Sequence, residues 1–256
     1  MSETDITSNS IDILKQVSVA TLATALYKRG LRNQVIQDVH PVGQNHGKKS
    51  VAGAPNMVGP AFTLRYMPAR EDRNTLAEFK NPQHPQRQAI EQCPEGHVLV
   101  MDSRKDARAA SAGDILITRL MMRGAAGVVT DGGFRDSDSI AALDMPAYHS
   151  RPASPTNLTL HEAIDINVPI GCGDAAVFPG DYIVGDNDSV IIVPAHLVNE
   201  LATEAAEMTA YEDFVTEQVK KGISIIGLYP CTKEEHKKAF EAWRAENKRQ
   251  RIEARE

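Results

Sequence analysis

Apolar residues near the start of the chain recur first with helical and then with alternating spacing. Between Ile11 and Arg29 they fall at positions 11, 14, 17, 19, 22, 23 and 26, and Gly30 follows. This spacing predicts one helix that ends at Gly30. Further along, Val58–Met67 alternates as a strand does, and Pro60 predicts that this strand lies at a sheet edge or starts irregularly.

The segments on either side of this strand are more polar. Residues 39–56 contain several glycines, prolines and lysines and predict a loop, whereas residues 68–95 predict an exposed, partly helical excursion.

The most regular pattern lies in the middle of the chain. His97–Asp102 is a short apolar run that ends in an acid, Asp114–Arg123 has helical spacing before Gly124, and Ala126–Thr130 is a second apolar run. Strand, helix and strand in this order predict a βαβ unit with parallel strands and a right-handed crossover.

The second half of the chain predicts five more elements. They are short strands at Pro146–His149 and Asn167–Ile170, a hairpin-like stretch at Ala176–Val193, a helix from Pro194 to about Lys221, and a charged helix at Lys233–Glu256 that carries Phe240 and Trp243.

Composition narrows the class of protein. The chain has 256 residues, 42% of them hydrophobic, and a formal net charge of −6, which argues against nucleic acid as the main partner. No apolar run approaches the roughly 18–20 residues of a membrane span, and the N-terminus lacks the pattern of a secretory signal. The three cysteines are widely spaced and fit a reducing compartment, so we expect a cytoplasmic protein without a membrane partner.

The βαβ unit gathers chemically useful residues at one edge of the predicted sheet. Gly113, Asp114, Ile115 and Leu116 begin the helix, and Arg135 and Asp136 follow the second strand. The first amides of a helix bind anions, and Arg135 could grip the same anion or stabilise an oxyanion. Asp136 suits Mg²⁺ or Mn²⁺, and Asp114 could accept a hydrogen bond from a metal-bound water.

Each of these residues also has an ordinary structural interpretation. Asp114 could simply cap the helix, and Arg135 and Asp136 could form an exposed loop pair. Their convergence on one sheet edge favours a binding site but leaves the reaction open. The eight histidines form no HxH or HExxH pattern, which argues against a zinc site.

The run GDILITRLMMRGAAGVVTDGGFRD, residues 113–136, closely resembles the signature of the RraA-like family, which includes aldolases of 4-hydroxy-2-oxo acids and regulators of RNase E. The similarity extends to residues 59–64, 167–169 and 179–194. It implies an α/β/β/α swivelling-domain sandwich with a central βαβ unit and an added C-terminal helix, assembled as a homotrimer or homohexamer. We therefore expect a disordered N-terminus at 1–10, a catalytic domain at 11–222 and a helical extension at 223–256.

The resemblance also implies a reaction. In the aldolase members a divalent metal, Mg²⁺ or Mn²⁺, binds at the position of Asp136, and the equivalents of Arg135 and of the amides after Gly113–Asp114 hold the pyruvyl group. The aspartate matching Asp114 orients a water for proton transfer. A glutamate from a neighbouring subunit completes the site. Glu212 is the nearest match, and Glu207 and Glu217 compete with it.

This pattern predicts cleavage of a 4-hydroxy-2-oxo acid to pyruvate, with oxaloacetate decarboxylation as a side activity. The alternative is a non-catalytic regulator that binds a ribonuclease or another protein partner. Residues 68–95 are an addition relative to short family members and could shape the pocket on the acyl side.

Overall fold

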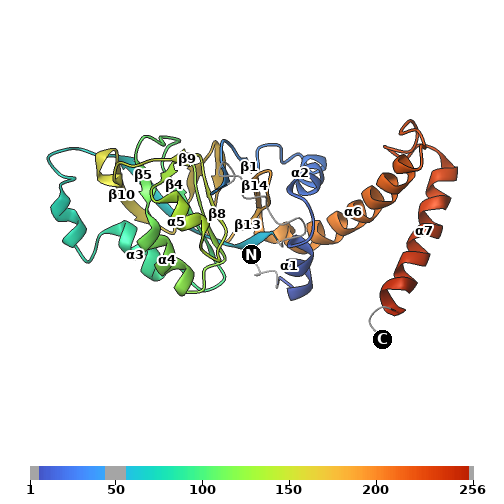
Figure 1. The fold of residues 1–256 in the computed structure, drawn as a ribbon, viewed down its shortest axis with the longest axis horizontal. Helices are drawn as coiled ribbons and strands as arrows, with labels where there is room; N and C mark the ends of the chain where they lie inside the picture. The colour runs from blue at the N-terminus through green and yellow to red at the C-terminus, as the bar shows by residue number, and fades with distance from the viewer. Residues whose placement is uncertain (1–5, 44–55, 254–256) are drawn as a thin grey trace. The chain divides into compact units, whose positions relative to one another are not determined.

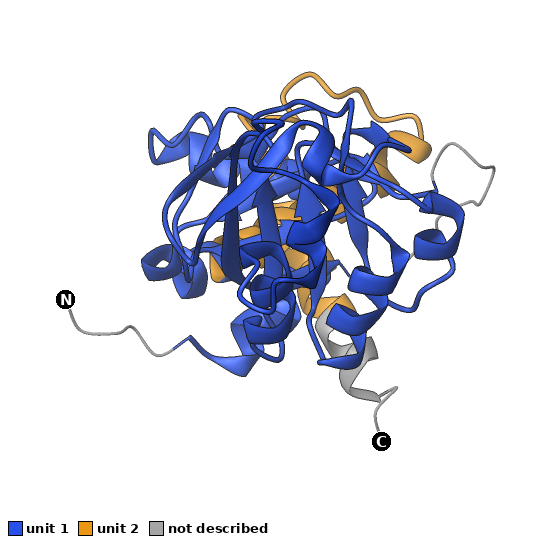
Figure 2. Cartoon of the chain, turned by 90° about the vertical axis from the view of Figure 1, so that its left-hand side faces the viewer, with its two compact units in different colours: residues 1–202 blue, residues 203–256 orange. Residues whose placement is uncertain are grey.

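The computed structural model describes residues 6–43 and 56–253, with side chains to residue 247. The chain forms two compact units, residues 1–202 and 203–256 (Figure 2). The boundary falls inside helix α6 (Val198–Lys220), whereas the sequence places the end of the main domain at residue 222.

A nine-stranded mixed sheet organises the first unit (Figure 1). Its order is β1-β14-β13-β3-β4-β6-β8-β2, and β10 also pairs with β3. The strands are β1 (Val35–Ile36), β2 (His40–Pro41), β3 (Met57–Pro68), β4 (Val98–Asp102), β6 (Gly127–Thr130), β8 (Ala147–His149), β10 (His161–Ile166), β13 (Tyr182–Gly185) and β14 (Val190–Val193).

Two small sheets and several helices complete this unit. The sheets are β11 (Ile170–Cys172) with β12 (Ala175–Val177), and β5 (Ala110–Ala112), β7 (Gly133–Phe134) and β9 (Arg151–Pro152) in that order. The helices are α1 (Ser8–Leu14), α2 (Val19–Lys28), α3 (Pro85–Gln92), α4 (Asp114–Met122) and α5 (Ser137–Ala141), with 3₁₀ turns η2 (Leu76–Lys80), η3 (Asn157–Thr159) and η4 (Ala195–Leu197).

The predicted βαβ unit is confirmed. Strand β4 pairs in parallel with β6, with Val98 opposite Gly127, and helix α4 connects them. The helix is followed by Gly124, whose φ of 81° is the left-handed conformation that a glycine adopts after a helix.

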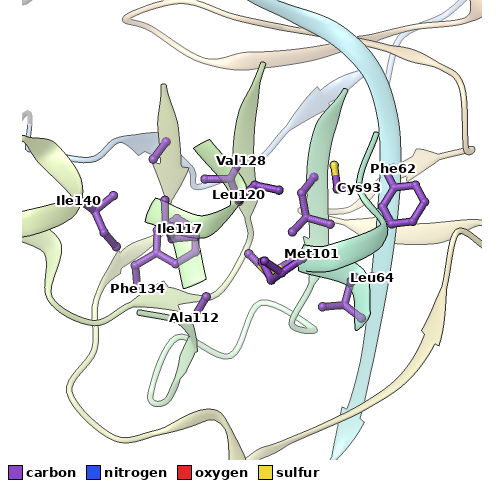
Figure 3. Packing of buried hydrophobic residues seen from close by; sticks show 14 of the residues in the cluster. Phe62, Leu64, Cys93, Met101, Ala112, Ile117, Leu120, Val128, Phe134 and Ile140 are labelled. Carbon is purple, nitrogen blue, oxygen red and sulfur yellow. The ribbon is translucent and has the colours of Figure 1, made fainter. Parts of the chain in front are cut away.

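Strand β4 is buried on both faces, because its side chains alternate between two apolar clusters. Leu99 and Met101 pack in the cluster that includes Ile117 and Leu120 of α4. Figure 3 shows Met101, Ile117 and Leu120 in this cluster. Val98 and Val100 face a second cluster, which includes residues of β13 and β14. A continuous apolar run is what a strand covered on both sides requires, so the sequence pattern and the layered packing agree.

The predicted helix at Ile11–Arg29 is instead two helices. Helix α1 ends at Leu14, and α2 starts at Val19. Ser18 adopts an extended conformation and its hydroxyl accepts a hydrogen bond from the Thr21 amide, which makes it the N-cap of α2. The apolar spacing continues across residues 15–18 and therefore predicted one helix. The extended conformation of Ser18, whose hydroxyl caps α2, ends the helical hydrogen bonding before Val19.

The strand predicted at Val58–Met67 is confirmed. Of the two alternatives that Pro60 left open, the edge position does not hold, and the irregular start agrees with the structure, since pairing with β4 begins only at Ala61. Strand β3 lies between β13 and β4. Pro60 has no amide hydrogen to donate. The next amide, of Ala61, donates to the Asp181 carbonyl on the β13 side, so the Pro60 nitrogen faces the β4 side. Because the ladder with β4 starts only at Ala61, no ladder bond is lost at Pro60.

Around residue 167 the chain turns rather than forming the predicted strand Asn167–Ile170. Asn167 has a φ of 56°, the left-handed region that asparagine tolerates, and separates β10 from β11. The remaining predicted strands match strands of the structure, including the β13–β14 hairpin, whereas β10 (His161–Ile166) was not predicted. The loop predicted at 39–56 contains β2 at its start, and residues 44–55 lie outside the described residues.

The second unit consists of α6 from Thr203 onward and α7 (Glu234–Glu253) with their connection. Phe214, Val215 and Leu228 are buried, and Tyr211, Phe240 and Trp243 pack against them. Helix α7, the predicted tail helix, therefore packs within the second unit through Phe240 and Trp243, which contact the buried cluster around Phe214 of α6. No helix in the described part of the chain is long and apolar enough to cross a membrane.

Candidate functional site

A pocket of about 190 Å³ opens where β5 passes into α4. It brings together all six residues that the sequence predicted at the sheet edge: Gly113, Asp114, Ile115, Leu116, Arg135 and Asp136. It is also lined by Ala110 and Ala112 of β5 and by Phe79, Gln86, Arg87, Thr156 and Asn157. The volume suits a small molecule below drug size.

The start of α4 contributes backbone donors to this pocket. Gly113 is the N-cap, so no side chain at that position can accept a bond from the first-turn amides. Asp114 is the first helical residue, and its Oδ1 lies 2.7 Å from the Ile115 amide that donates to it. The interpretation of Asp114 as the helix N-cap is therefore wrong. The dipole and the first-turn amides favour an anion here.

Strand β7 fixes the position of Arg135 and Asp136. The Arg135 amide donates to the Ala112 carbonyl at 3.1 Å and so continues the β5–β7 pairing. The Arg135 Nε donates to Asp136 Oδ2 at 3.2 Å. Because this bond uses one of five guanidinium N–H donors, the guanidinium can also bind a carboxylate.

Asp136 has an unusual backbone conformation for a non-glycine residue. Its φ is 59° and its ψ is 39°, and it stands at the N-cap position of α5 without a side-chain bond to that helix. A capping aspartate would normally bind the first amides of its helix. Here the carboxylate is instead beside Arg135, so its oxygens remain on the pocket side of the loop.

Gly113 is required by the close approach of these two side chains. A methyl group at Gly113 would lie 2.9 Å from Arg135 Cγ and 2.9 Å from Asp136 Oδ2. The glycine therefore allows the Arg135–Asp136 pair to pack directly over the start of α4. The sequence predicted Gly113 at the start of the helix, but it could not show that Arg135 and Asp136 approach this glycine so closely.

Buried hydrogen bonds hold the strand that carries Gly113. The Ser111 carbonyl of β5 accepts from Tyr66 Oη at 2.8 Å and from Gln86 Nε2 at 2.5 Å. The hydroxyls of Ser111 and Thr130 are 2.7 Å apart. These bonds connect β5 to β3, α3 and β6, and they make the pocket floor part of the buried core.

Asp131, two residues before Gly133, is also a structural residue. Its carboxylate accepts from the amides of Ser103 at 2.6 Å, Lys105 at 3.1 Å and Gly173 at 3.1 Å. Burial raises the pKa of this carboxyl, while these amide bonds oppose the shift. Asp131 therefore connects its own loop to the loop at Ser103–Lys105 and to the turn at Gly173. No pattern in the sequence predicted this role.

Besides Ala110 and Ala112 of β5, five pocket residues lie outside the motif that the sequence identified. Phe79, Gln86 and Arg87 come from the 68–95 excursion, and Thr156 and Asn157 come from the start of η3. The excursion was expected to shape the pocket, but no spacing in the sequence pointed to its individual residues or to η3.

The three candidate glutamates of α6 lie in the second unit. Glu207 pairs with Arg244, and Glu217 accepts from Trp243 Nε1 at 2.9 Å, so both contact α7. Glu212 accepts from Tyr229 Oη at 3.3 Å. Its contribution to a neighbouring subunit's site stays a prediction.

The carboxylates of the pocket suit a hydrated metal. Within residues 6–43 and 56–247 there is no group of three or more His, Cys, Asp or Glu side chains that could enclose a metal ion. Asp114 and Asp136 nevertheless line one pocket. Mg²⁺ binds in this way, through one or two carboxylates with the remaining positions filled by water and substrate.

Comparison with known proteins gives a consistent match. The family model described as "RraA-like: Aldolase/RraA" matches residues 19–192. A protein of Halalkalibacterium halodurans named "Putative 4-hydroxy-4-methyl-2-oxoglutarate aldolase" is 29% identical over 176 residues, which cover 68% of this chain and 76% of that protein. A protein of the same name from Ectopseudomonas mendocina is 29% identical over 164 residues, 64% of this chain and 90% of that protein.

A solved structure is similar across most of the chain. The Streptomyces coelicolor protein RraAS2, described as an unusual member of the RNase ES inhibitor RraA protein family, aligns with a TM-score of 0.69 and 24% identity. The alignment covers 82% of this chain and 97% of that chain. At this identity the similarity concerns the fold, a mixed α/β sheet structure followed by a C-terminal helix.

Proposed function

The chain belongs to the RraA-like (Aldolase/RraA) family, and from the pocket described above we propose that it is a divalent-metal-dependent carbon–carbon lyase. Its substrate is a 4-hydroxy-2-oxo acid, which it cleaves to pyruvate and a second carbonyl compound. Decarboxylation of oxaloacetate follows as a side activity, because breaking that carbon–carbon bond leaves the same three-carbon fragment.

One observation carries the proposal. Arg135 and Asp136 pack over Gly113 at the start of α4, which places a guanidinium, a carboxylate and first-turn helix amides in one pocket. A surface that only bound another protein would have no need for this combination in a small pocket. The names of the relatives at 29% identity support the same chemistry.

The pocket fits a metal with few protein ligands. Asp136 would hold Mg²⁺ or Mn²⁺, with Asp114 accepting a hydrogen bond from one of its waters. When bound, such an ion acts as a Lewis acid on the 2-oxo group of the substrate.

The residues of the chain supply the remaining functions. The Leu116 amide and the Arg135 guanidinium bind the substrate carboxylate and the 2-oxo oxygen, while the Ile115 amide donates to Asp114 Oδ1. When the bond between C3 and C4 breaks, negative charge develops on that oxygen, and Arg135 stabilises it. Asp114 orients a water that accepts the proton of the 4-hydroxyl group, and a proton returned to C3 of the enolate then gives pyruvate. Glu212 of a neighbouring subunit completes the proton path.

An assay of pyruvate release tests the proposal. The purified chain is incubated with 4-hydroxy-4-methyl-2-oxoglutarate or oxaloacetate, after removal of metal and again after addition of Mg²⁺ or Mn²⁺. We expect pyruvate formation only with metal, and an Arg135→Gln variant whose kcat is lower by about 10²–10³-fold.

The rival function is a regulator of an RNA-degrading nuclease, since the RraAS2 protein of similar fold is described as a member of an RNase inhibitor family. The absence of pyruvate release with either metal and either substrate would contradict the lyase and favour this rival.

A further inference from the structure

Two histidines outside the proposed lyase pocket face each other in the main sheet. His40 of β2, a strand at one end of the sheet order, lies directly opposite His149 of β8 in an antiparallel pair. Directly opposite residues of such a pair point to the same face of the sheet, with Cβ atoms about 4.5–5.5 Å apart. The two imidazoles therefore stand next to each other on one face.

Both histidines line a small cavity. Its volume is about 20 Å³, and its other lining residues are Pro41, Gly43, Ser137, Ser150 and Pro152. This space is enough for one particle of the size of a water molecule. The residues that line it include no carboxylate, lysine or arginine, so the two imidazoles are its strongest metal-binding groups. Asp136 does not line it, which separates this cavity from the carboxylate proposed to hold Mg²⁺.

Neither imidazole is engaged elsewhere. Among the residues that the structure describes, the side chains of His40 and His149 form no hydrogen bond and no ion pair. The Nδ1 atom of His149 is enclosed by protein, so its Nε2 is the nitrogen left for a ligand in the cavity. His40 is exposed, so its ring can turn toward a ligand without losing a bond.

His149 is the fixed member of the pair. Its side chain is 5% exposed, and its ring stacks on Phe134 with the ring centres 5.7 Å apart. Burial, and to a smaller extent the nearby His40, lowers the pKa of the His149 imidazole to about 4. The ring is therefore neutral at pH 7, which is the form that binds a metal ion.

We propose that His40 and His149 bind one divalent transition-metal ion of the Zn²⁺ type, with water in the remaining coordination positions. Imidazole nitrogens suit Zn²⁺, Cu²⁺ and Ni²⁺, whereas Mg²⁺ prefers oxygen ligands. Structural zinc sites have four protein ligands, so two imidazoles predict reversible binding. A bound ion would link β2 to β8 and so stabilise this end of the sheet. The inference does not rest on the proposed lyase activity.

A zinc titration of the full chain tests this site. Calorimetry with Zn²⁺ is carried out in excess Mg²⁺, which occupies the carboxylate site proposed at Asp136. The decisive variant is His40→Gln, because an exposed side chain without a bond can be replaced while the fold is kept. His196→Gln, at another exposed histidine that does not line the cavity, is the matched control. Anomalous diffraction from crystals soaked in Zn²⁺ locates the ion.

We expect one Zn²⁺ to bind per chain, with an anomalous peak between the rings of His40 and His149. His40→Gln raises the dissociation constant at least about tenfold, since even the loss of an outer partner of a metal ligand costs about 10–100-fold. His196→Gln changes it less than about twofold. Without Zn²⁺ the unaltered protein and His40→Gln unfold at the same urea concentration, whereas Zn²⁺ raises this concentration only for the unaltered protein.

Three results would overturn the site. They are no saturable binding of Zn²⁺, a dissociation constant that His40→Gln leaves unchanged, and an anomalous peak at Cys231 or at another histidine in place of this pair. Each of these results leaves the proposed lyase standing, because that activity is measured separately as pyruvate release with Mg²⁺.

Discussion

At the scale of single residues, the central feature of the site is the contact between a glycine and a charged pair. Arg135 and Asp136 are adjacent in sequence, and the left-handed backbone at Asp136 keeps its carboxylate beside the arginine instead of at the start of α5. Gly113 supplies the space beneath them. The packing of Arg135 and Asp136 over the start of α4 therefore depends on a position that has no side chain.

Replacing this glycine tests the arrangement. Gly113→Ala would displace Arg135 and Asp136 from the start of α4, since the new methyl group would lie 2.9 Å from an atom of each. We expect at least about a tenfold loss of kcat/KM for pyruvate release and weaker activation by Mg²⁺. Gly171→Ala is the control, because a methyl group there meets nothing within 4 Å. Equal activity of both variants would contradict the proposed packing.

At the scale of elements, the small sheet β5-β7-β9 positions the site. It places Gly113 directly after β5 and Arg135 directly after β7, so parallel pairing of two short strands brings the two halves of the motif together. The buried bonds of Tyr66 and Gln86 to the Ser111 carbonyl hold β5 in place.

Removing one of these bonds measures their contribution. Tyr66→Phe deletes a hydroxyl that is buried against Ser111, while Gln86 continues to satisfy the carbonyl. We expect a loss of about 1 kcal/mol in the free energy of unfolding, measured by urea denaturation. Tyr27→Phe, at a residue that is 61% exposed, should change it by less than about 0.5 kcal/mol. A Tyr66→Phe protein as stable as the control would contradict this role.

The elements also show what a sequence pattern can and cannot predict. The βαβ unit was predictable because β4 is apolar on both faces and α4 has a glycine stop. The break at Ser18 was missed because one hydroxyl decides it, and β5 and β9 were missed because two- and three-residue strands leave no periodicity.

The candidate site divides in the same way. The residues from Gly113 to Leu116 and the Arg135–Asp136 pair were predictable because they lie next to elements of the βαβ unit and match a family signature. Arg87 and Asn157 were not, since Arg87 reaches the pocket from the 68–95 excursion and Asn157 from η3, and only tertiary packing brings them there.

At the scale of the whole molecule, the net charge of the chain has the same sign as the proposed substrate. The formal net charge of −6 opposes the approach of an anionic substrate. For the proposed substrate, attraction would therefore be local, from Arg135, the start of α4 and the proposed metal ion. A homotrimer or homohexamer is the assembly that the family resemblance implies.

Mixed oligomers test whether neighbouring subunits share a site. Asp136→Asn and Glu212→Gln are each expected to lower pyruvate release by at least about tenfold. Co-expressed subunits of the two variants should recover part of the activity, because some sites then combine an intact Asp136 with an intact Glu212. Glu217→Gln, which keeps an acceptor for Trp243, is the control and should remain active alone. No recovery in the mixture, or full activity of Glu212→Gln, would contradict a shared site.

The most direct test of the whole account is the Mg²⁺ dependence of pyruvate release in Asp136→Asn, beside Asp144→Asn as an exposed aspartate outside the pocket. Both variants are titrated with Mg²⁺ on 4-hydroxy-4-methyl-2-oxoglutarate. A metal site at Asp136 predicts that the unaltered protein and Asp144→Asn reach the same saturating rate, whereas Asp136→Asn stays at least about 10²-fold slower at every concentration. An Asp136→Asn protein that follows the same Mg²⁺ curve at the same rate would contradict it.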